Sequence, residues 1–255
     1  MPHVVANGVR LHVQRLGAEG PPVVLIHGLV VGSMATWYFG LAAKLAEHHR
    51  VLLYDLRGHG GSERTQTGYD VGTMAEDLSA LLADSFDEPV IVAGYSYGAL
   101  VALRFALDAP ERVSKLALVE APLPPSAHGE VMEFLSMPPE KQFGALSPAM
   151  RRSVSSGQRR ARRLAALLQF HQSESSLVRD LQETPDVPDH ELAALHVPTL
   201  CLYGQESPCR DVGDRLAAVL PNARLASMTG GHRLVQESPG DVTAVLLDFT
   251  RGDDG

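Results

Sequence analysis

A serine with a glycine two residues before it and another two residues after it is the residue of this sequence best placed to do chemistry. Ser96 lies in the pentapeptide GYSYG at 94–98, after the apolar run 90–94 and before an amphipathic stretch over 98–108. Glycines permit a sharp turn from strand to helix, which exposes the serine hydroxyl beside the positive end of the helix. The pattern predicts a nucleophilic serine, with the Tyr97 N–H facing the charge that develops on an attacked carbonyl oxygen.

A second amide donor is expected from the loop that follows an earlier apolar run. The run 23–28 ends in His27 and Gly28, and Leu29 comes next. A tetrahedral intermediate places a full charge on one oxygen, so two N–H donors stabilise it better than one. We expect the Leu29 N–H to be the second donor, and the His27 side chain to turn inward and shape the loop.

A histidine near the end of the chain is the candidate for the general base. His232 follows two glycines after the last apolar run, 223–228, and precedes Pro239. A neutral imidazole accepts a proton near neutral pH and returns it to a leaving group. We therefore expect His232 to take the proton of Ser96.

Short apolar runs alternate with amphipathic stretches along most of the chain, which predicts a mostly parallel sheet with helices on both faces. An Asn7-Gly8 turn within residues 3–16 predicts an antiparallel hairpin at one edge. The expected strands are 23–28, 51–55, 90–94, 116–120, 199–204 and 223–228, and the expected helices are 36–48, 73–83, 98–108, 211–220 and 241–250.

The alternation stops over residues 121–196, where proline-containing stretches flank helical patches. A segment of that length without strands predicts a helical lid inserted into a core domain of residues 1–120 and 197–255. Its apolar side chains favour a hydrophobic acyl group or macrolactone as substrate. The substrate-contacting candidates are two residues of the core and three of the lid: Trp37, Tyr95, Met132, Leu135 and Phe170.

At this point the chain resembles the α/β-hydrolase family. The motifs HGLVVGS, DLRGHGGS (55–62), GYSYG, LYG and GGH occur in the order that the family shows. The resemblance covers nearly the whole chain. It implies an eight-stranded sheet, a helical cap over the active site, a triad in the order serine, acid, histidine, and a positioning role for residues 55–62.

The triad acid departs from the common pattern of the family, which places Asp three residues after the glycine of LYG. Here Ser207 occupies that position. Glu120, at the end of the run 116–120, is the preferred candidate, since a charged residue there needs a partner and His232 could supply it. A minority of the family, including proteins similar to zearalenone lactonase, takes its acid from that strand end as glutamate. Glu206 and Asp211 are the alternatives.

A serine nucleophile selects among the reactions of the family. Epoxide hydrolases and haloalkane dehalogenases of this family use aspartate, whereas serine suits acyl transfer from an ester, lactone or thioester. The sequence has no phosphate loop, no dinucleotide motif and no Cys/His spacing typical of zinc, so we expect neither cofactor nor metal. We predict a serine hydrolase of a hydrophobic ester or lactone.

Two rival functions remain open. Residues 151–163 hold six arginines and no acid, which indicates either a solvated helix face or a dock for an acidic acyl carrier protein. The second reading belongs to a thioesterase or cyclase of polyketide-type secondary metabolism. The other rival is a ligand-binding protein that keeps the fold but has negligible turnover.

Composition restricts the partners further. The net charge of −8 disfavours nucleic acid and anionic membranes, since phosphate contacts need Lys and Arg. No apolar run of about 18 residues predicts a membrane span. Two cysteines in 255 residues, with no signal-peptide pattern at the N-terminus, predict a cytoplasmic protein without disulfides.

Overall fold

A single eight-stranded sheet forms the centre of the protein. The computed structural model describes all residues except 1, 124–128, 147–150, 153–154, 156 and 252–255. The strand order is β1-β2-β4-β3-β5-β6-β7-β8. The strands are β1 (His3–Ala6), β2 (Val9–Leu16), β3 (Pro22–Ile26), β4 (Arg50–Tyr54), β5 (Val90–Tyr95), β6 (Val113–Val119), β7 (Thr199–Gly204) and β8 (Ala223–Met228).

The predicted mostly parallel sheet is confirmed. Strands β3 to β8 pair in parallel, while β1 and β2 form an antiparallel hairpin and β2 pairs antiparallel with β4. The hairpin turns at Asn7 and Gly8, whose φ angles are 48° and 74°. Both residues have a left-handed backbone conformation. A two-residue turn needs this conformation to match the twist of the strands that it joins.

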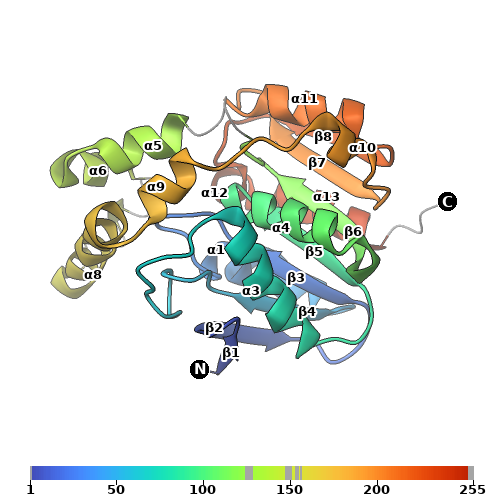
Figure 1. Ribbon diagram of the computed structural model, residues 1–255, viewed down its shortest axis with the longest axis horizontal. Coiled ribbons are helices and arrows are strands. Elements are labelled where there is room, and N and C mark those ends of the chain that lie inside the picture. Colours follow the sequence, from blue (N-terminus) through green and yellow to red (C-terminus); the bar gives the residue numbers. More distant parts are fainter. Residues whose placement is uncertain (1, 124–128, 147–150, 153–154, 156, 252–255) are drawn as a thin grey trace.

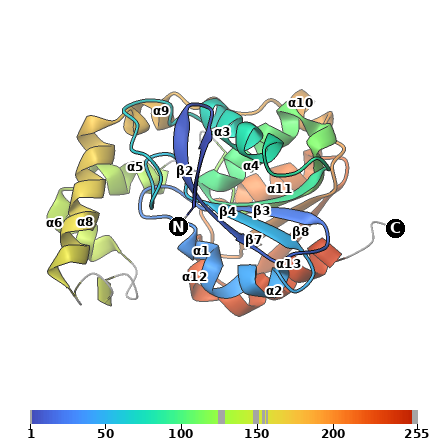
Figure 2. The same cartoon turned by 90° about the horizontal axis from the view of Figure 1, so that it is seen from below.

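Helices cover both faces of the sheet (Figure 2). One face carries α3 (Val71–Ala83), α4 (Tyr97–Asp108) and α11 (Arg210–Val219). The other carries α1 (Ala35–Trp37), α2 (Ala43–Leu45), α12 (Leu234–Glu237) and α13 (Pro239–Arg251). Each layer packs its own apolar cluster against the strands, so the core is divided by the sheet.

One expected helix differs from the prediction. The segment predicted as a helix over 36–48 is divided into α1, a π-helical turn at Tyr38–Ala42, and α2. Gly40 lies within the wider turn, and the space around it is open. Glycine has low helix propensity and no side chain that could pack there. The regular α-helix is therefore not stabilised at that point, and the wider turn can form.

Helices replace strands between β6 and β7, where the lid is expected (Figure 1). They are α5 (Gly129–Ser136), α6 (Pro139–Ala145), α8 (Gln158–Gln169), a π-helical turn at Phe170–Glu174, α9 (Leu177–Gln182) and α10 (Asp189–Ala193). Helices α5, α6 and α8 stand together beyond one end of the sheet. The division into a lid at 121–196 and a separate core stays a prediction. Among the described residues, no helix combines the length and apolar character needed to cross a membrane.

The inserted helices are anchored to the loop between β4 and α3. The Asp180 carboxylate accepts the Tyr69 N–H at 3.0 Å, and the Ser176 N–H donates to the Gln66 carbonyl at 2.8 Å. Phe170 and Leu177 are buried in the core cluster that α3 and α4 share. Polar and apolar contacts therefore fix the C-terminal half of the insertion to the core.

A buried histidine at this junction makes stability depend on pH. His171 is fully buried, its ring lies 4.6 Å from that of His59, and neither ring nitrogen has a hydrogen-bond partner in the described part of the chain. Burial, and secondarily the charge of Arg64, lower the pKa of His171 to about 4. An unfolded histidine, with a pKa near 6.5, binds a proton in this interval that folded His171 does not. The free energy of unfolding therefore falls as the pH drops from 6.5 to 4, by up to about 3 kcal/mol from this residue.

Urea unfolding between pH 4 and pH 7 tests this dependence. The variant His171→Leu is expected to lose less stability on acidification than the wild type, because it has no imidazole to protonate on unfolding. The same substitution at exposed His190 is the matched control and should follow the wild-type curve. Equal pH dependence in wild type and His171→Leu would show that this imidazole does not contribute.

Candidate active site

A strained turn presents Ser96 at the junction of β5 and α4. Ser96 has φ 54° and ψ −127°, a backbone conformation that residues other than glycine rarely adopt. A Cβ on Gly94 would lie 2.2 Å from the Gly98 carbonyl oxygen, and one on Gly98 would lie 2.4 Å from that of His27. Only glycine fits at both positions. Tyr97 is the first residue of α4, so its N–H has no partner within the helix.

The close approach at Gly98 leads to a stability prediction. Gly98→Ala should lower the free energy of unfolding by about 2 kcal/mol or more, because a methyl group would overlap backbone of β3 and its loop. Gly144→Ala in α6 is the matched control, since nothing lies within 4 Å of its added Cβ and alanine is the better helix former. Urea unfolding of both variants measures the difference. A Gly98→Ala protein as stable as Gly144→Ala would contradict the tight turn.

The loop after β8 brings an imidazole to the serine. His232 Nε2 lies 3.0 Å from Ser96 Oγ. The Tyr95 ring stacks on the imidazole at 5.8 Å, and the Tyr95 hydroxyl donates to the His232 carbonyl at 2.9 Å. A Cβ on Gly204 would meet the Gly230 carbonyl at 2.2 Å, so this loop lies directly against the end of β7. The ring is thereby held from the side and from its own backbone.

Glu120 completes the arrangement from the end of β6. Its carboxylate is fully buried, and Oε2 lies 3.1 Å from His232 Nδ1. The Gly204 N–H donates to Oε1 at 2.5 Å, and the Ser207 hydroxyl donates to Oε2. These donors compensate the carboxylate for the loss of water. Glu120 has φ 55°, a left-handed conformation that the surrounding contacts must support.

The alternative acids do not approach the imidazole. Glu206 is exposed, and its N–H donates to the Gly230 carbonyl at 3.0 Å. Asp211 is exposed in the first turn of α11. Neither carboxylate has a hydrogen bond or ion pair to His232 among the described residues. The structure therefore brings together Ser96, His232 and Glu120.

Sequence reasoning missed two residues beside the buried carboxylate. The Ser207 hydroxyl accepts the Cys209 N–H at 3.0 Å while it donates to Glu120, and Cys209 Sγ lies 3.6 Å from His232 Nδ1. The signal for Ser207 was its place where the family expects Asp. No signal pointed to Cys209. Ligand atoms of Glu120, Cys209 and His232 lie within 4.8 Å of one another, a mixed oxygen, sulfur and nitrogen set, although Glu120 and His232 already bond to each other.

The loop after β3 lies against the serine. A Cβ on Gly28 would be 3.1 Å from Ser96 Cβ and 3.6 Å from Ser96 Oγ. Val30 has φ 69°, an outlier for a β-branched residue, and its N–H donates to His59 Nε2 at 2.9 Å. The adjoining Leu29 N–H has no acceptor in the part of the chain that the structure describes. The amide expected as a donor is therefore available next to Ser96.

His27 has the structural role that was expected for it. Its ring is fully buried, Nδ1 lies 2.7 Å from the Gly28 carbonyl oxygen, and Nε2 accepts the Leu56 N–H at 3.0 Å. Burial lowers the pKa of His27, so the ring is neutral at pH 7. The Asp55 carboxylate accepts the Met34 N–H at 2.7 Å. The loop after β4 thus holds the loop after β3, which is the positioning role that the resemblance implies.

The residues expected to contact substrate are mostly packed into the core. Trp37 is 1% exposed, and its indole N–H donates to the Ile26 carbonyl at 3.0 Å. Tyr95 lies in the same cluster, so both aromatic rings support the sheet and His232 rather than present a surface to a ligand. Leu135 and Phe170 are buried against the other cluster. The Met132 side chain lies outside the described residues.

Comparisons with known proteins agree with this architecture. The family described as alpha/beta hydrolase fold matches residues 21–192. An uncharacterised protein of Mycobacterium tuberculosis is 38% identical over 107 residues, which are 42% of this chain and 31% of that protein. The aligned region thus spans about a third of this relative. Epoxide hydrolase A of M. tuberculosis is 28% identical and aligns over 98% of this chain and 96% of its own.

A solved structure shows the same fold over its full length. The enol-lactonase of Burkholderia xenovorans LB400 superposes with a TM-score of 0.76 at 22% identity, covering 98% of this chain and all of that one.

Proposed function

The chain belongs to the α/β hydrolase fold family, and we propose that it is a serine hydrolase of carboxylic esters or lactones that acts through an acyl-enzyme. Ser96 is the nucleophile, His232 is the general base, and Glu120 orients His232. The Leu29 and Tyr97 N–H groups bind the oxyanion. The substrate is a small molecule with a hydrophobic acyl part.

One observation supports the proposal most strongly, namely a continuous hydrogen-bonded series from a hydroxyl to a buried carboxylate. Ser96 Oγ lies 3.0 Å from His232 Nε2, and His232 Nδ1 lies 3.1 Å from Glu120 Oε2. Because Glu120 accepts a hydrogen bond from the N–H at Nδ1, Nε2 of the neutral ring has no proton and can accept the one from Ser96. The order and the distances suit nucleophilic catalysis by a hydroxyl.

The reaction proceeds in two halves. Ser96 Oγ attacks the substrate carbonyl carbon while His232 takes the hydroxyl proton, and the carbonyl oxygen becomes an oxyanion between the two amides. His232 then gives the proton to the leaving alkoxide oxygen, and the acyl group stays on Ser96. In the second half His232 removes a proton from water, which attacks the ester carbonyl. The bond from the carbonyl carbon to Ser96 Oγ then breaks, His232 returns the proton to that oxygen, and the acid and the free serine are released.

The serine supports one of the activities named for the similar proteins over the other. One relative is called an epoxide hydrolase and one structural neighbour an enol-lactonase. The residue at the turn here is Ser96 rather than aspartate, which favours attack on a carbonyl over opening of an epoxide. We therefore propose ester or lactone hydrolysis for this chain.

A panel of neutral esters, lactones, acyl thioesters and epoxides tests the proposed reaction class. We expect turnover of esters or lactones with a hydrophobic acyl part, no turnover of epoxides, and loss of all turnover in Ser96→Ala. Preference for thioesters would instead support the thioesterase alternative. Complete lack of turnover, with retained ligand binding, would support a binding protein.

A further inference from the structure

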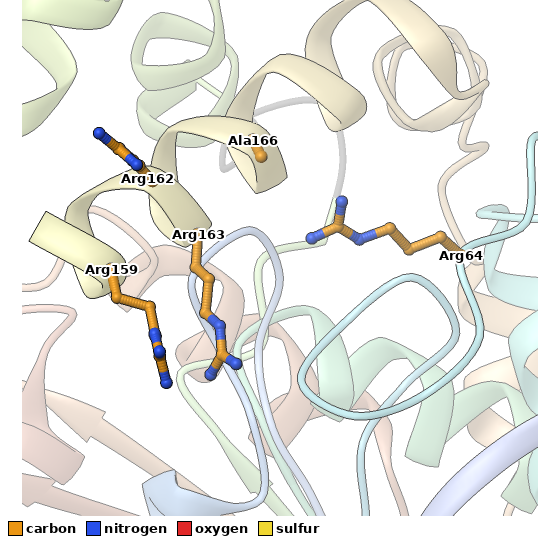
Figure 3. A pocket seen from close by; sticks show the side chains of 5 residues that line it. All are labelled: Arg64, Arg159, Arg162, Arg163 and Ala166. Carbon is orange, nitrogen blue, oxygen red and sulfur yellow. The ribbon is translucent and has the colours of Figure 1, made fainter.

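A hollow lined by arginines lies between α8 and the loop that follows β4 (Figure 3). Its volume is about 500 Å³ and its lining consists of Arg64, Arg159, Arg162, Arg163 and Ala166. Arg64 reaches from its loop toward α8, while Arg159 and Arg163 extend side by side from the helix and Arg162 extends in another direction. Three guanidinium groups from two separate segments thus border one space.

These arginines lack the acidic partners that other arginines of the protein have. Arg57, Arg104 and Arg215 each pair with aspartates within 3 Å. Within the described ranges, no carboxylate forms an ion pair with any arginine of the hollow. Like charges that face one space repel one another unless an anion lies between them. All four arginines are exposed, so water and salt screen part of this repulsion, and a negatively charged group in the hollow would remove the rest.

The position of the arginines in α8 strengthens this argument. The helix begins at Gln158, has no side-chain cap and has no acidic residue in its first turn. Arg159 and Arg163 lie one turn apart on the same face, with Arg159 in the first turn at the positive end of the helix dipole and Arg163 in the second turn. Cations at that end are unfavourable, whereas an anion there is stabilised by both the dipole and the guanidinium groups.

A series of packed side chains joins the wall of the hollow to the loop beside the proposed catalytic serine. The Arg64 guanidinium lies over the Phe170 ring at 5.5 Å, and the ring of the next residue, His171, packs against that of His59 at 4.6 Å with a tilt of 30°. His59 in turn accepts the N–H of Val30, in the loop that contacts Ser96. Both nitrogens of buried His171 lack a hydrogen-bond partner in the described part of the protein. A buried polar group without a partner is uncommon, and here it lies one residue from the Phe170 ring that Arg64 covers.

We propose that the hollow binds a carboxylate or phosphate group at the far end of the substrate whose carbonyl is attacked by Ser96. The inference rests on the proposed function, and it assigns the substrate class as an ester or lactone that carries a second, acidic group. Arg64 and Arg163 bind that group from the two sides. A concave site between two segments suits a compact anion better than the surface of a partner protein.

Matched substrates test the proposal. Hemi-esters of straight-chain dicarboxylic acids with p-nitrophenol are compared with neutral p-nitrophenyl esters of the same chain length, and phosphate-ended analogues form a second series. The measured quantity is the ratio of kcat/KM for the anionic substrate to kcat/KM for the neutral one, because this ratio cancels any general loss of activity. We expect a ratio above one in the wild type that falls as salt is added.

Arginine variants locate the preference. Arg64→Gln and Arg163→Gln should each lower the ratio by roughly three- to tenfold, and the double variant by more. Arg224→Gln on β8 removes the same charge at a distant, ion-paired site and should leave the ratio at the wild-type value. Whichever series, carboxylate or phosphate, shows the larger ratio identifies the group.

A ratio that these two substitutions leave unchanged, while neutral esters are hydrolysed, would overturn the anion site and leave the proposed function intact. If the arginine substitutions reduced only the hydrolysis of a carrier-bound thioester, that result would overturn the anion site in favour of a docking surface for a protein. Failure of a fluorophosphonate to modify Ser96 would instead count against the proposed function itself.

Discussion

Ser96→Ala is expected to lower kcat for a p-nitrophenyl ester by a factor of about 10⁴ to 10⁶, because alanine has no oxygen to attack the carbonyl. Steady-state kinetics measures kcat, and binding of a non-hydrolysable substrate analogue by calorimetry measures whether the pocket survives. Since alanine keeps the Cβ and the backbone conformation of Ser96, and the lost hydroxyl bonds only to His232 among the described residues, the free energy of unfolding should stay within about 1 kcal/mol of the wild type.

Two results would contradict this expectation. A fall in kcat of less than about tenfold would show that another group performs the attack. Loss of both kcat and analogue binding, with a lower free energy of unfolding, would show that the hydroxyl has a structural role instead.

Glu120→Gln is the second substitution with a large expected effect, a loss of about 10³ to 10⁴ in kcat. The amide can donate its N–H to His232 Nδ1, which leaves the ring proton on Nε2. His232 would then donate to Ser96 rather than accept its proton, and the glutamine cannot stabilise the imidazolium that forms. The fold should persist, since the Gln oxygen in the place of Oε1 still accepts the Gly204 N–H, and the Ser207 hydroxyl can turn to accept the second N–H of the amide.

Glu206→Gln is the matched control for that substitution. It removes the same charge just after the neighbouring strand β7, but at an exposed carboxylate. Among the described residues, only the backbone of Glu206 is hydrogen-bonded to the loop that carries His232. We expect kcat within about twofold of the wild type. The reverse order of effects, with Glu206→Gln the more damaging change, would transfer the role of triad acid to Glu206.

Local patterns were sufficient to predict the strands and the sharp turn at Ser96. Six strands were predicted within a few residues, because buried parallel strands are nearly continuous apolar runs. The turn at Ser96 was also predictable, since two glycines at fixed spacing between a strand and a helix leave few alternatives. The juxtaposition with His232 came from its place after the last strand, at the sheet end where parallel strands finish.

Other features depend on contacts that no local pattern contains. Trp37 and Tyr95 are aromatic and close to the motifs, but the sequence does not show which face of the sheet they cover, and both are buried. The bond from Ser207 to Glu120 joins residues 87 positions apart. Likewise, the run of arginines in α8 does not show which of them face Arg64 across the hollow.

The role of Ser96 as an activated nucleophile is tested most directly by incubation with a fluorophosphonate, followed by intact mass and peptide mass spectrometry. We predict one covalent adduct per chain, located on Ser96, which forms much more slowly in Glu120→Gln and is absent in Ser96→Ala. An unmodified protein, or an adduct on a different residue, would contradict the account.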